Sequence, residues 1–378
     1  MANNWAFLIW LGVTGLLCSQ FGGTRVELTD RGPETRTSWF WAVVMFAPVA
    51  LGAALRGSYE ADTGAYKNMF ELAPAAFSEA VEFVADSDRD KGYIIWEILF
   101  KSIFGDNFQL FIGINAIFCA VLLVMVYRKY SCSYLISMFL FVAGFDYYQW
   151  MFNGMRQFIA VCIALACTED IIKRRYKRII LPFVLAVSMH MSVLIILPCL
   201  VFVQGKAFNR RMMLFAGSVV LVGVILGRAG LLNDLIAELM QSTQYDSVLD
   251  EFYMTMDSGT NALRVLVYMV PTILAVVGLR FIRHADDPVI NFCTNMSVIS
   301  SGLYIISMFT SAVMIGRLPI YFSIYNYILL PWEIEHIFDR RSAKMVTTML
   351  VLCYLAYNFY QVVMVYGQRF SLGFLSLG

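Results

Sequence analysis

Residues 107–127 read NFQLFIGINAIFCAVLLVMVY, a stretch without a single charged side chain. A helix needs roughly 20 mostly apolar residues to cross the hydrocarbon core of a bilayer, and this stretch meets that length. Similar runs recur along the whole chain, so the pattern predicts an all-α polytopic membrane protein with about ten transmembrane helices. We place them at residues 5–21, 39–55, 107–127, 133–149, 154–172, 212–227, 263–283, 288–309, 318–334 and 345–366.

The composition supports this fold class. The chain has 378 residues, of which 60% are hydrophobic and only 15% are charged, whereas soluble domains are about half apolar and about a quarter charged. The run 5–21 has no positive segment before it and no small-x-small cleavage site, so we expect a true crossing. We expect one membrane domain over residues 1–378, with outer-face loops at 56–106 and 228–261. Residues 92–104 have the pattern of an amphipathic helix lying at the interface.

The sequence lacks the common nucleotide, zinc and nucleic-acid motifs. Walker A, GxGxxG and HExxH patterns are missing, and no nucleic-acid-binding motif is present. The eight cysteines lie in or beside apolar runs and form no CxxC pair, which favours small core residues over disulfides or metal ligands. We therefore expect no cofactor, no metal and no nucleic-acid partner.

Lys and Arg in the short loops predict the orientation of the chain. With the loops 22–38, 128–132, 173–178, 205–211, 284–287 and 335–344 in the cytoplasm, and with the flanking helix ends counted, that side holds 18 of the 28 basic residues, and most acidic residues lie on the other side. This arrangement predicts that both termini face outward.

The run 179–204 has basic clusters at both ends, Lys173–Arg178 and Lys206–Arg211. A full crossing would move one cluster outside and invert every later loop. We therefore favour a re-entrant element that breaks near His190, with two arms of about 15 Å each. Such backbone is tolerated only inside the protein or beside a water-filled cavity. A full crossing that violates the charge rule is the alternative.

With this topology, several costly polar residues fall on the outer half of the membrane. An ionisable residue at membrane depth usually faces an interior cavity and serves a function. Three arginines near one face could bind a pyrophosphate, because the planar guanidinium binds phosphate oxygens in pairs and stays charged. A histidine or aspartate within reach could take a proton from a sugar hydroxyl. The set consists of Arg56, Asp62, Tyr66, Arg156, His190 and Arg317.

Each of these residues also has a structural interpretation. Arg56 and Arg317 end or precede crossings and could reach lipid headgroups. Arg156 could pair with Asp146. A histidine in an apolar run is often a hydrogen-bonded core residue, and Asp62 could cap a helix.

Four segments of the chain resemble the EpsG/Wzy-type polymerases of exopolysaccharide and O-antigen. They are LRGSYEADTGAY with Arg56, Asp62 and Tyr66; NGMRQFIA with Arg156 and Gln157; HMS at 190–192; and GRLPIYF with Arg317 and Tyr321. The resemblance extends over most of the chain, roughly residues 55–331.

The resemblance implies a GT-C-like glycosyltransferase of the bacterial inner membrane, active on its outer face. Such an enzyme joins undecaprenyl-pyrophosphate-linked oligosaccharide repeats, one as donor and one as acceptor, and releases undecaprenyl pyrophosphate. It would work without a metal and would have a chain-length regulator as a possible partner besides its lipids. On this basis Arg156, Arg317 and, third, Arg56 bind pyrophosphate. Tyr66, Gln157 and Tyr321 contact substrate. His190 is the first candidate for the base and Asp62 the second.

Three alternative functions stay open at this point. A ligase would transfer the glycan from the same lipid carrier to another acceptor. A flippase or other transporter should show repeated halves and a cavity open to both sides, whereas this chain has no internal repeat and its candidate residues lie on one side. A non-catalytic assembly scaffold would tolerate the loss of Arg156 and His190.

Overall fold

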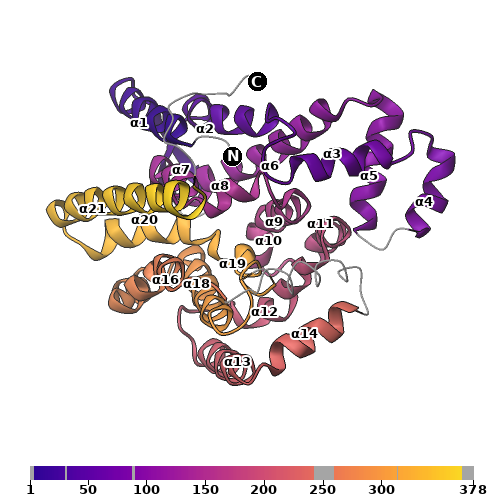
Figure 1. Cartoon of the computed structure of the whole chain (residues 1–378). Coiled ribbons are helices and arrows are strands. Elements are labelled where there is room, and N and C mark those ends of the chain that lie inside the picture. The colour runs from indigo at the N-terminus through magenta and orange to yellow at the C-terminus, as the bar shows by residue number, and fades with distance from the viewer. Residues whose placement is uncertain (1–3, 30–31, 87–89, 242–258, 313, 368–378) are drawn as a thin grey trace. The chain divides into compact units, whose positions relative to one another are not determined.

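The computed structural model describes residues 4–29, 32–86, 90–241, 259–312 and 314–367 (Figure 1). The chain forms two compact units, and each is described by itself. Unit 1 combines Met1–Phe83, Ile94–Ala166 and Ile334–Gly378, and unit 2 combines Val84–Tyr93 and Cys167–Glu333. No observation here tests the expectation of a single membrane domain, which stays a prediction.

Unit 1 is built mainly of helices. In chain order its elements are α1 (Trp5–Gln20), β1 (Thr24–Thr29), β2 (Gly32–Thr37), α2 (Trp39–Ala54), α3 (Thr63–Leu72), η1 (Phe77–Glu79), α6 (Phe108–Tyr130), α7 (Tyr134–Ala143), α8 (Asp146–Trp150), α9 (Met155–Ala166), α21 (Arg340–Phe359) and the π-helical turn η3 (Tyr360–Val365). The helices α4 (Ala80–Asp86), α5 (Lys91–Phe104) and α20 (Asn326–Ile337) each have residues in both units.

Every secondary-structure element in the described part of unit 2 is a helix. Its elements are α10 (Thr168–Ile172), α11 (Tyr176–Met189), the 3-10 helix η2 (Met191–Ile195), α12 (Ile196–Phe202), α13 (Arg210–Arg228), α14 (Leu231–Gln241), α16 (Ala262–Val277), α17 (Leu279–Ala285), α18 (Pro288–Ser307) and α19 (Ile320–Ser323). The helix α18 lies at the centre of this unit, and 83% of the residues in its most apolar stretch are buried.

Five of the described α-helices begin at a residue whose side chain caps the first turn. Asn107, Asn209, Asn261, Asp287 and Asp339 each accept a hydrogen bond from a backbone N–H of the first turn of α6, α13, α16, α18 and α21. These side chains replace bonds that the first turn of a helix cannot make within itself. Asp287 is followed by Pro288, a residue whose fixed φ suits the first helical position.

Within the described ranges, four helices are long and apolar enough to cross a membrane: α6, α13, α18 and α21 with η3. The pair α16 and α17, bent by 70° at Gly278, makes a fifth if it counts as one span. Shorter apolar helices lie at Trp5–Gln20, Trp39–Ala54, Tyr134–Ala143, Met155–Ala166 and Met191–Phe202. The protein is thus a helical membrane protein, and the count of about ten crossings stays a prediction.

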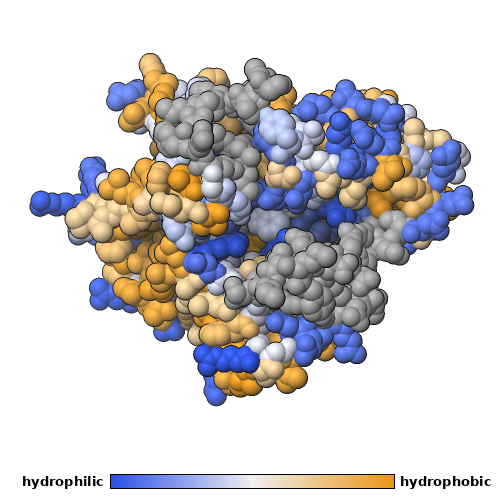
Figure 2. All heavy atoms as spheres, in the orientation of Figure 1, coloured by the Kyte–Doolittle hydropathy of each residue, from blue (hydrophilic) through white to orange (hydrophobic). Residues whose placement is uncertain are grey.

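The surface fits this assignment. Figure 2 shows hydrophobic residues over the outward side of α16 and α21, in the orientation of Figure 1. Leu266 on α16 and Leu352 on α21 are more than half exposed, as are Leu214 and Leu221 on α13. Helix faces that leave large aliphatic side chains uncovered are suited to contact with lipid acyl chains.

The expectation of an all-α chain is wrong in one place. Residues of the predicted cytoplasmic loop 22–38 form an antiparallel hairpin of β1 and β2, with Thr24 opposite Thr37 and Val26 opposite Thr35. Threonine and valine favour strands, since their branched side chains pack well on a pleated surface. Arg128 at the end of α6 bonds the Thr37 carbonyl oxygen at 2.8 Å and pairs with Glu27, which fixes the hairpin beside that helix.

Two other expectations are confirmed. The helix predicted over 92–104 is present as α5, while its place at the membrane interface stays a prediction. The break expected near His190 is present too, because α11 ends at Met189 and a 3-10 turn starts at Met191. His190 between them has extended backbone, with φ −161° and ψ 118°. The choice between a re-entrant element and a full crossing stays open. Of the predicted outer loop 228–261, the residues 242–258 lie outside the described part of the chain.

Candidate functional site

Arg56 is buried in unit 1 and hydrogen-bonds to three neighbouring segments of the chain. Its Nε donates to Thr63 Oγ1 at 3.0 Å, and its Nη1 donates to the carbonyl oxygens of Ala53 at 2.9 Å and Met151 at 3.0 Å. The residue is only 1% exposed. These bonds tie the end of α2 to the start of α3 and to the segment before α9. They give Arg56 a structural role, and its part in pyrophosphate binding stays a prediction.

Arg156 has a different setting, at the second position of α9. It is half-buried, and its guanidinium carbon lies 5.9 Å from the centre of the Tyr66 ring. Tyr66 lies on α3, one helical turn after Asp62, and Arg156 also hydrogen-bonds its phenol. Burial raises the pKa of the Tyr66 phenol, and the charge of Arg156 opposes that shift. Unit 1 thus brings together three of the residues predicted from the sequence, Asp62, Tyr66 and Arg156.

Asp62 is exposed and stands at the N-cap position of α3, as one interpretation of the sequence expected. Its carboxylate does not make the side-chain capping bond of that position. It acts on the neighbouring phenol instead, since its charge raises the pKa of Tyr66. Gln157, next to Arg156, is buried with 4% exposure.

A carboxyl group that the sequence did not single out lies beside this cluster. Glu97 on α5 is 1% exposed, and its Oε1 has no hydrogen-bond partner within the described structure. Burial raises the pKa of Glu97 to about 8, against the opposing charges of Arg156 and Lys101. The Lys101 ammonium donates to the carbonyl oxygens of Phe70 and Ala73. Near neutral pH Glu97 is therefore mostly uncharged, and the cluster keeps the positive charge of Arg156.

In unit 2 the break after α11 brings His190 to a distant tyrosine. His190 Nδ1 lies 2.7 Å from Ser192 Oγ, and Ser192 Oγ lies 2.8 Å from Tyr321 Oη on α19. His190 is half-buried and Tyr321 is buried. The three side chains form a continuous hydrogen-bonded row of the kind that orients an imidazole and fixes its tautomer.

Arg317 precedes this row in the chain, in the turns that lead into α19. It is half-buried and stands four residues before Tyr321. Of the predicted residues, unit 1 therefore holds Arg56, Asp62, Tyr66, Arg156 and Gln157, and unit 2 holds His190, Arg317 and Tyr321. Across the described ranges, no three His, Cys, Asp or Glu side chains gather as a metal site would require.

Glu97 is a residue that sequence reasoning missed, and Ser192 was quoted in the HMS segment without a role. Ser192 stands in the HMS segment, and the signal was its position two residues after His190. Glu97 lies three residues after Ile94 and three before Phe100, both buried. Residues three apart share a helix face, so an acidic residue between two apolar ones on this face of α5 indicates a buried carboxyl group.

No curated protein and no solved structure matches the chain. The family model described as EpsG matches residues 39–374, which covers most of the chain and every residue of the two clusters. Membership of that family suggests a polysaccharide polymerase role and therefore an enzyme. The resemblance carried by the Arg56, Arg156, His190 and Arg317 segments is thus confirmed, and the chain belongs to the EpsG family.

Proposed function

We propose that this protein is a polymerase that joins undecaprenyl-pyrophosphate-linked oligosaccharide repeats on the outer face of the bacterial inner membrane. In each cycle a hydroxyl oxygen of the acceptor repeat attacks the anomeric carbon of the donor glycan. The new C–O bond forms as the bond from that carbon to the pyrophosphate oxygen breaks. Undecaprenyl pyrophosphate leaves with the bonding electron pair, and the hydroxyl proton goes to a base on the protein.

His190 is the base in this proposal. For Nε2 to accept the proton, the neutral ring must carry its hydrogen on Nδ1, and Ser192 Oγ at 2.7 Å is an acceptor for that hydrogen. The Ser192 hydroxyl then donates onward to Tyr321 at 2.8 Å. The amide of Ser192, 3.4 Å from Nδ1, favours the opposite tautomer but is the longer contact. Asp62 stays the second candidate, since it is exposed and beside the Arg156 cluster.

Arg156 and Arg317 bind pyrophosphate in this proposal. Both are half-buried, so each is partly desolvated and yet accessible. Because the leaving group already carries negative charge, fixed guanidinium groups can stabilise its departure, and no divalent metal is required. Arg56 is third, because carbonyl and hydroxyl oxygens of the protein occupy its donors.

The observation that carries the proposal is the His190–Ser192–Tyr321 row in a member of the EpsG family. The test is turnover per enzyme in proteoliposomes with purified lipid-linked repeats. General-base assistance is typically worth about 10²–10⁴ in rate, so His190→Ala should lower turnover by roughly that factor. Ser192→Ala should lower kcat less, since it removes only the group that holds the tautomer.

Arginine substitutions test the second half of the proposal. Arg156→Lys and Arg317→Lys keep the charge but lose the paired donors, so polymer yield should fall sharply while membrane abundance stays normal. Arg211→Lys, at an exposed position, is the matched control. Normal polymer from both variants, or a loss below about tenfold in His190→Ala, would contradict the assigned roles. Polymer transferred to a different acceptor molecule would indicate a ligase.

A further inference from the structure

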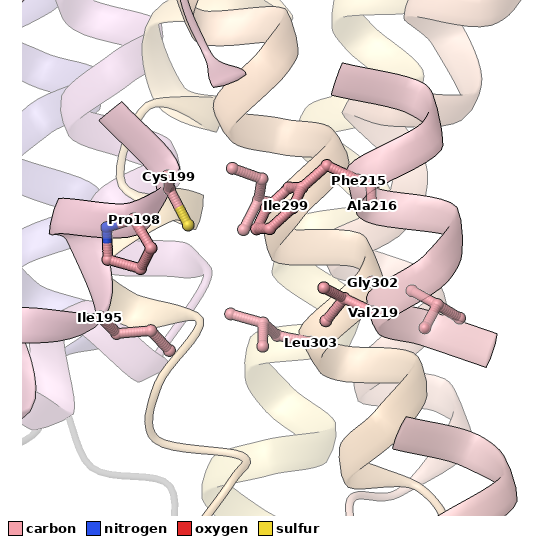
Figure 3. A pocket seen from close by; sticks show the side chains of 10 residues that line it. Ile195, Pro198, Cys199, Phe215, Ala216, Val219, Ile299, Gly302 and Leu303 are labelled. Carbon is pink, nitrogen blue, oxygen red and sulfur yellow. The ribbon is translucent and has the colours of Figure 1, made fainter. Parts of the chain in front are cut away.

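Unit 2 contains a partly open apolar cavity between η2, α12, α13 and α18. Its volume is about 130 Å³, and its walls come from η2 and α12 on one side and from α13 and α18 on the other (Figure 3). The lining side chains that define it are Ile195, Pro198, Ala216, Val219 and Ile299, together with Gly302. Apart from the Cys199 thiol, the side chains that line it are all apolar, so the cavity is suited to hydrocarbon and not to water.

Small residues leave this space open. A Cβ added at Gly302 on α18 would come within 2.7 Å of the Val220 side chain on α13. Ala216 contributes only a methyl group to the wall. At one end Phe215 stacks on Phe202 with ring centres 4.0 Å apart, which holds α12 against α13 beside the cavity. The space is therefore set by residues whose enlargement would fill it.

The cavity is connected to the candidate base through one short element. The 3-10 helix η2 starts directly after His190 and ends at Ile195, which lines the cavity. At about 2.0 Å per residue, this separates the two by about 10 Å along the helix axis. In a lipid-linked glycan the reacting sugar carbon is bonded to a diphosphate, and the diphosphate is bonded to the first isoprene unit. When the base contacts the acceptor hydroxyl at that carbon, the isoprene therefore lies a short distance away and needs an apolar site there.

We propose that this cavity binds an isoprene unit next to the pyrophosphate of the lipid carrier. A cavity of 150 Å³ in another protein holds one benzene molecule, so about 130 Å³ is room for about one five-carbon unit. The inference rests on the proposed function, because that function supplies the carrier. The rest of the carrier chain would lie outside, against the exposed aliphatic face of α13.

The test is photolabelling of the full-length protein in phospholipid vesicles. The probe is a polyprenyl pyrophosphate with a diazirine on the isoprene next to the pyrophosphate. We expect labelled peptides from α12, α13 and α18, and competition by unmodified polyprenyl pyrophosphate but not by additional phospholipid. Ala216→Leu takes up part of the space and should lower labelling about tenfold, as expected when about two carbon groups of the isoprene unit are no longer buried.

Two further variants keep the test decisive. Gly217→Leu is the matched control, because a Cβ there meets no atom within 4 Å. It should label like wild type. If the Ala216→Leu protein does not insert into the membrane, Val219→Ala takes its place. This substitution enlarges the cavity, so labelling should stay the same or rise. Labelling that maps elsewhere, that phospholipid abolishes equally, or that falls alike in the position 216 and 217 variants overturns the inference. Because labelling needs no turnover, a protein that labels but does not polymerise refutes only the proposed function. A protein that polymerises without being labelled refutes only the proposed role of the cavity.

Discussion

Replacing Glu97 with glutamine tests the buried carboxyl group of α5 through the pH dependence of stability. Its pKa in the folded protein is about 8, compared with an ordinary value of 4.5. Below about pH 4.5 both the folded and the unfolded chain hold the proton. Between 4.5 and 8 the unfolded chain releases it while the folded chain keeps it, so the free energy of unfolding falls as the pH rises. Above about 8 the loss is complete.

The size of the effect follows from these values. Each pKa unit corresponds to about 1.4 kcal/mol, so at pH 7 the carboxyl group of Glu97 lowers the free energy of unfolding by about 3 kcal/mol relative to acidic pH. Glutamine has the same shape and no charge to lose. Glu97→Gln should therefore unfold at a higher temperature than wild type at pH 7, by several degrees in Tm, and the two proteins should converge toward pH 5.

The assay is thermal unfolding of the detergent-purified protein across pH 5–9, with Glu82→Gln on the exposed side of α4 as the matched control. The control should follow wild type at every pH. A wild-type Tm that does not decline between pH 5 and 8 would refute the reasoning, as would a Glu97→Gln variant that is less stable at pH 7. Either result would mean that Glu97 is ionised and paired with Arg156 in the folded protein.

Other expected outcomes follow from the site and the topology. Arg56→Met should lower the free energy of unfolding by about 3 kcal/mol, because it leaves two buried carbonyl oxygens without their charged donor; Tm is the measurement, and Arg211→Met should not change it. In a cysteine-free background, Glu27→Cys and Lys206→Cys should resist an impermeant thiol reagent in intact cells while Asp86→Cys reacts. Labelling at position 206 from outside would exclude the re-entrant form of 179–204. Polymerisation should survive EDTA, and a strict need for a divalent cation would contradict arginine-only stabilisation of the leaving group.

The helices were largely predictable from sequence, because long apolar runs and their capping residues are local features. The run 107–127 and the helix at Phe108–Tyr130 differ by a few residues, and the extra turn carries Arg128 and Lys129. The break at His190 was also predictable, since the two basic clusters cannot lie on opposite sides without inverting the topology. The β1–β2 hairpin was not predicted, because its charged side chains are also typical of a loop; the local signal for a strand is that Thr24, Val26 and Leu28 alternate with Arg25 and Glu27.

The candidate site was less accessible from sequence, because it depends on contacts between distant residues. Ser192 and Tyr321 are 129 residues apart and meet at 2.8 Å, and no local pattern indicates such a pair. Arg56 and Arg156 look alike in the sequence as arginines at helix ends. Only the structure separates them, since the first is bonded to the carbonyl oxygens of Ala53 and Met151 and the second lies over Tyr66.

The lengths of α1 and α2 have a consequence for the surrounding bilayer. Each has 16 residues, which corresponds to about 24 Å at 1.5 Å per residue. The hydrocarbon core of a typical bilayer is about 30 Å thick. The predicted crossings at α1 and α2 would therefore thin the membrane locally or draw flanking side chains toward the headgroups, at a cost of a fraction of a kcal/mol for each Å of mismatch. Headgroups on the two sides would then lie closer together beside unit 1 than elsewhere, and activity in vesicles should rise as the acyl chains are shortened toward that thickness.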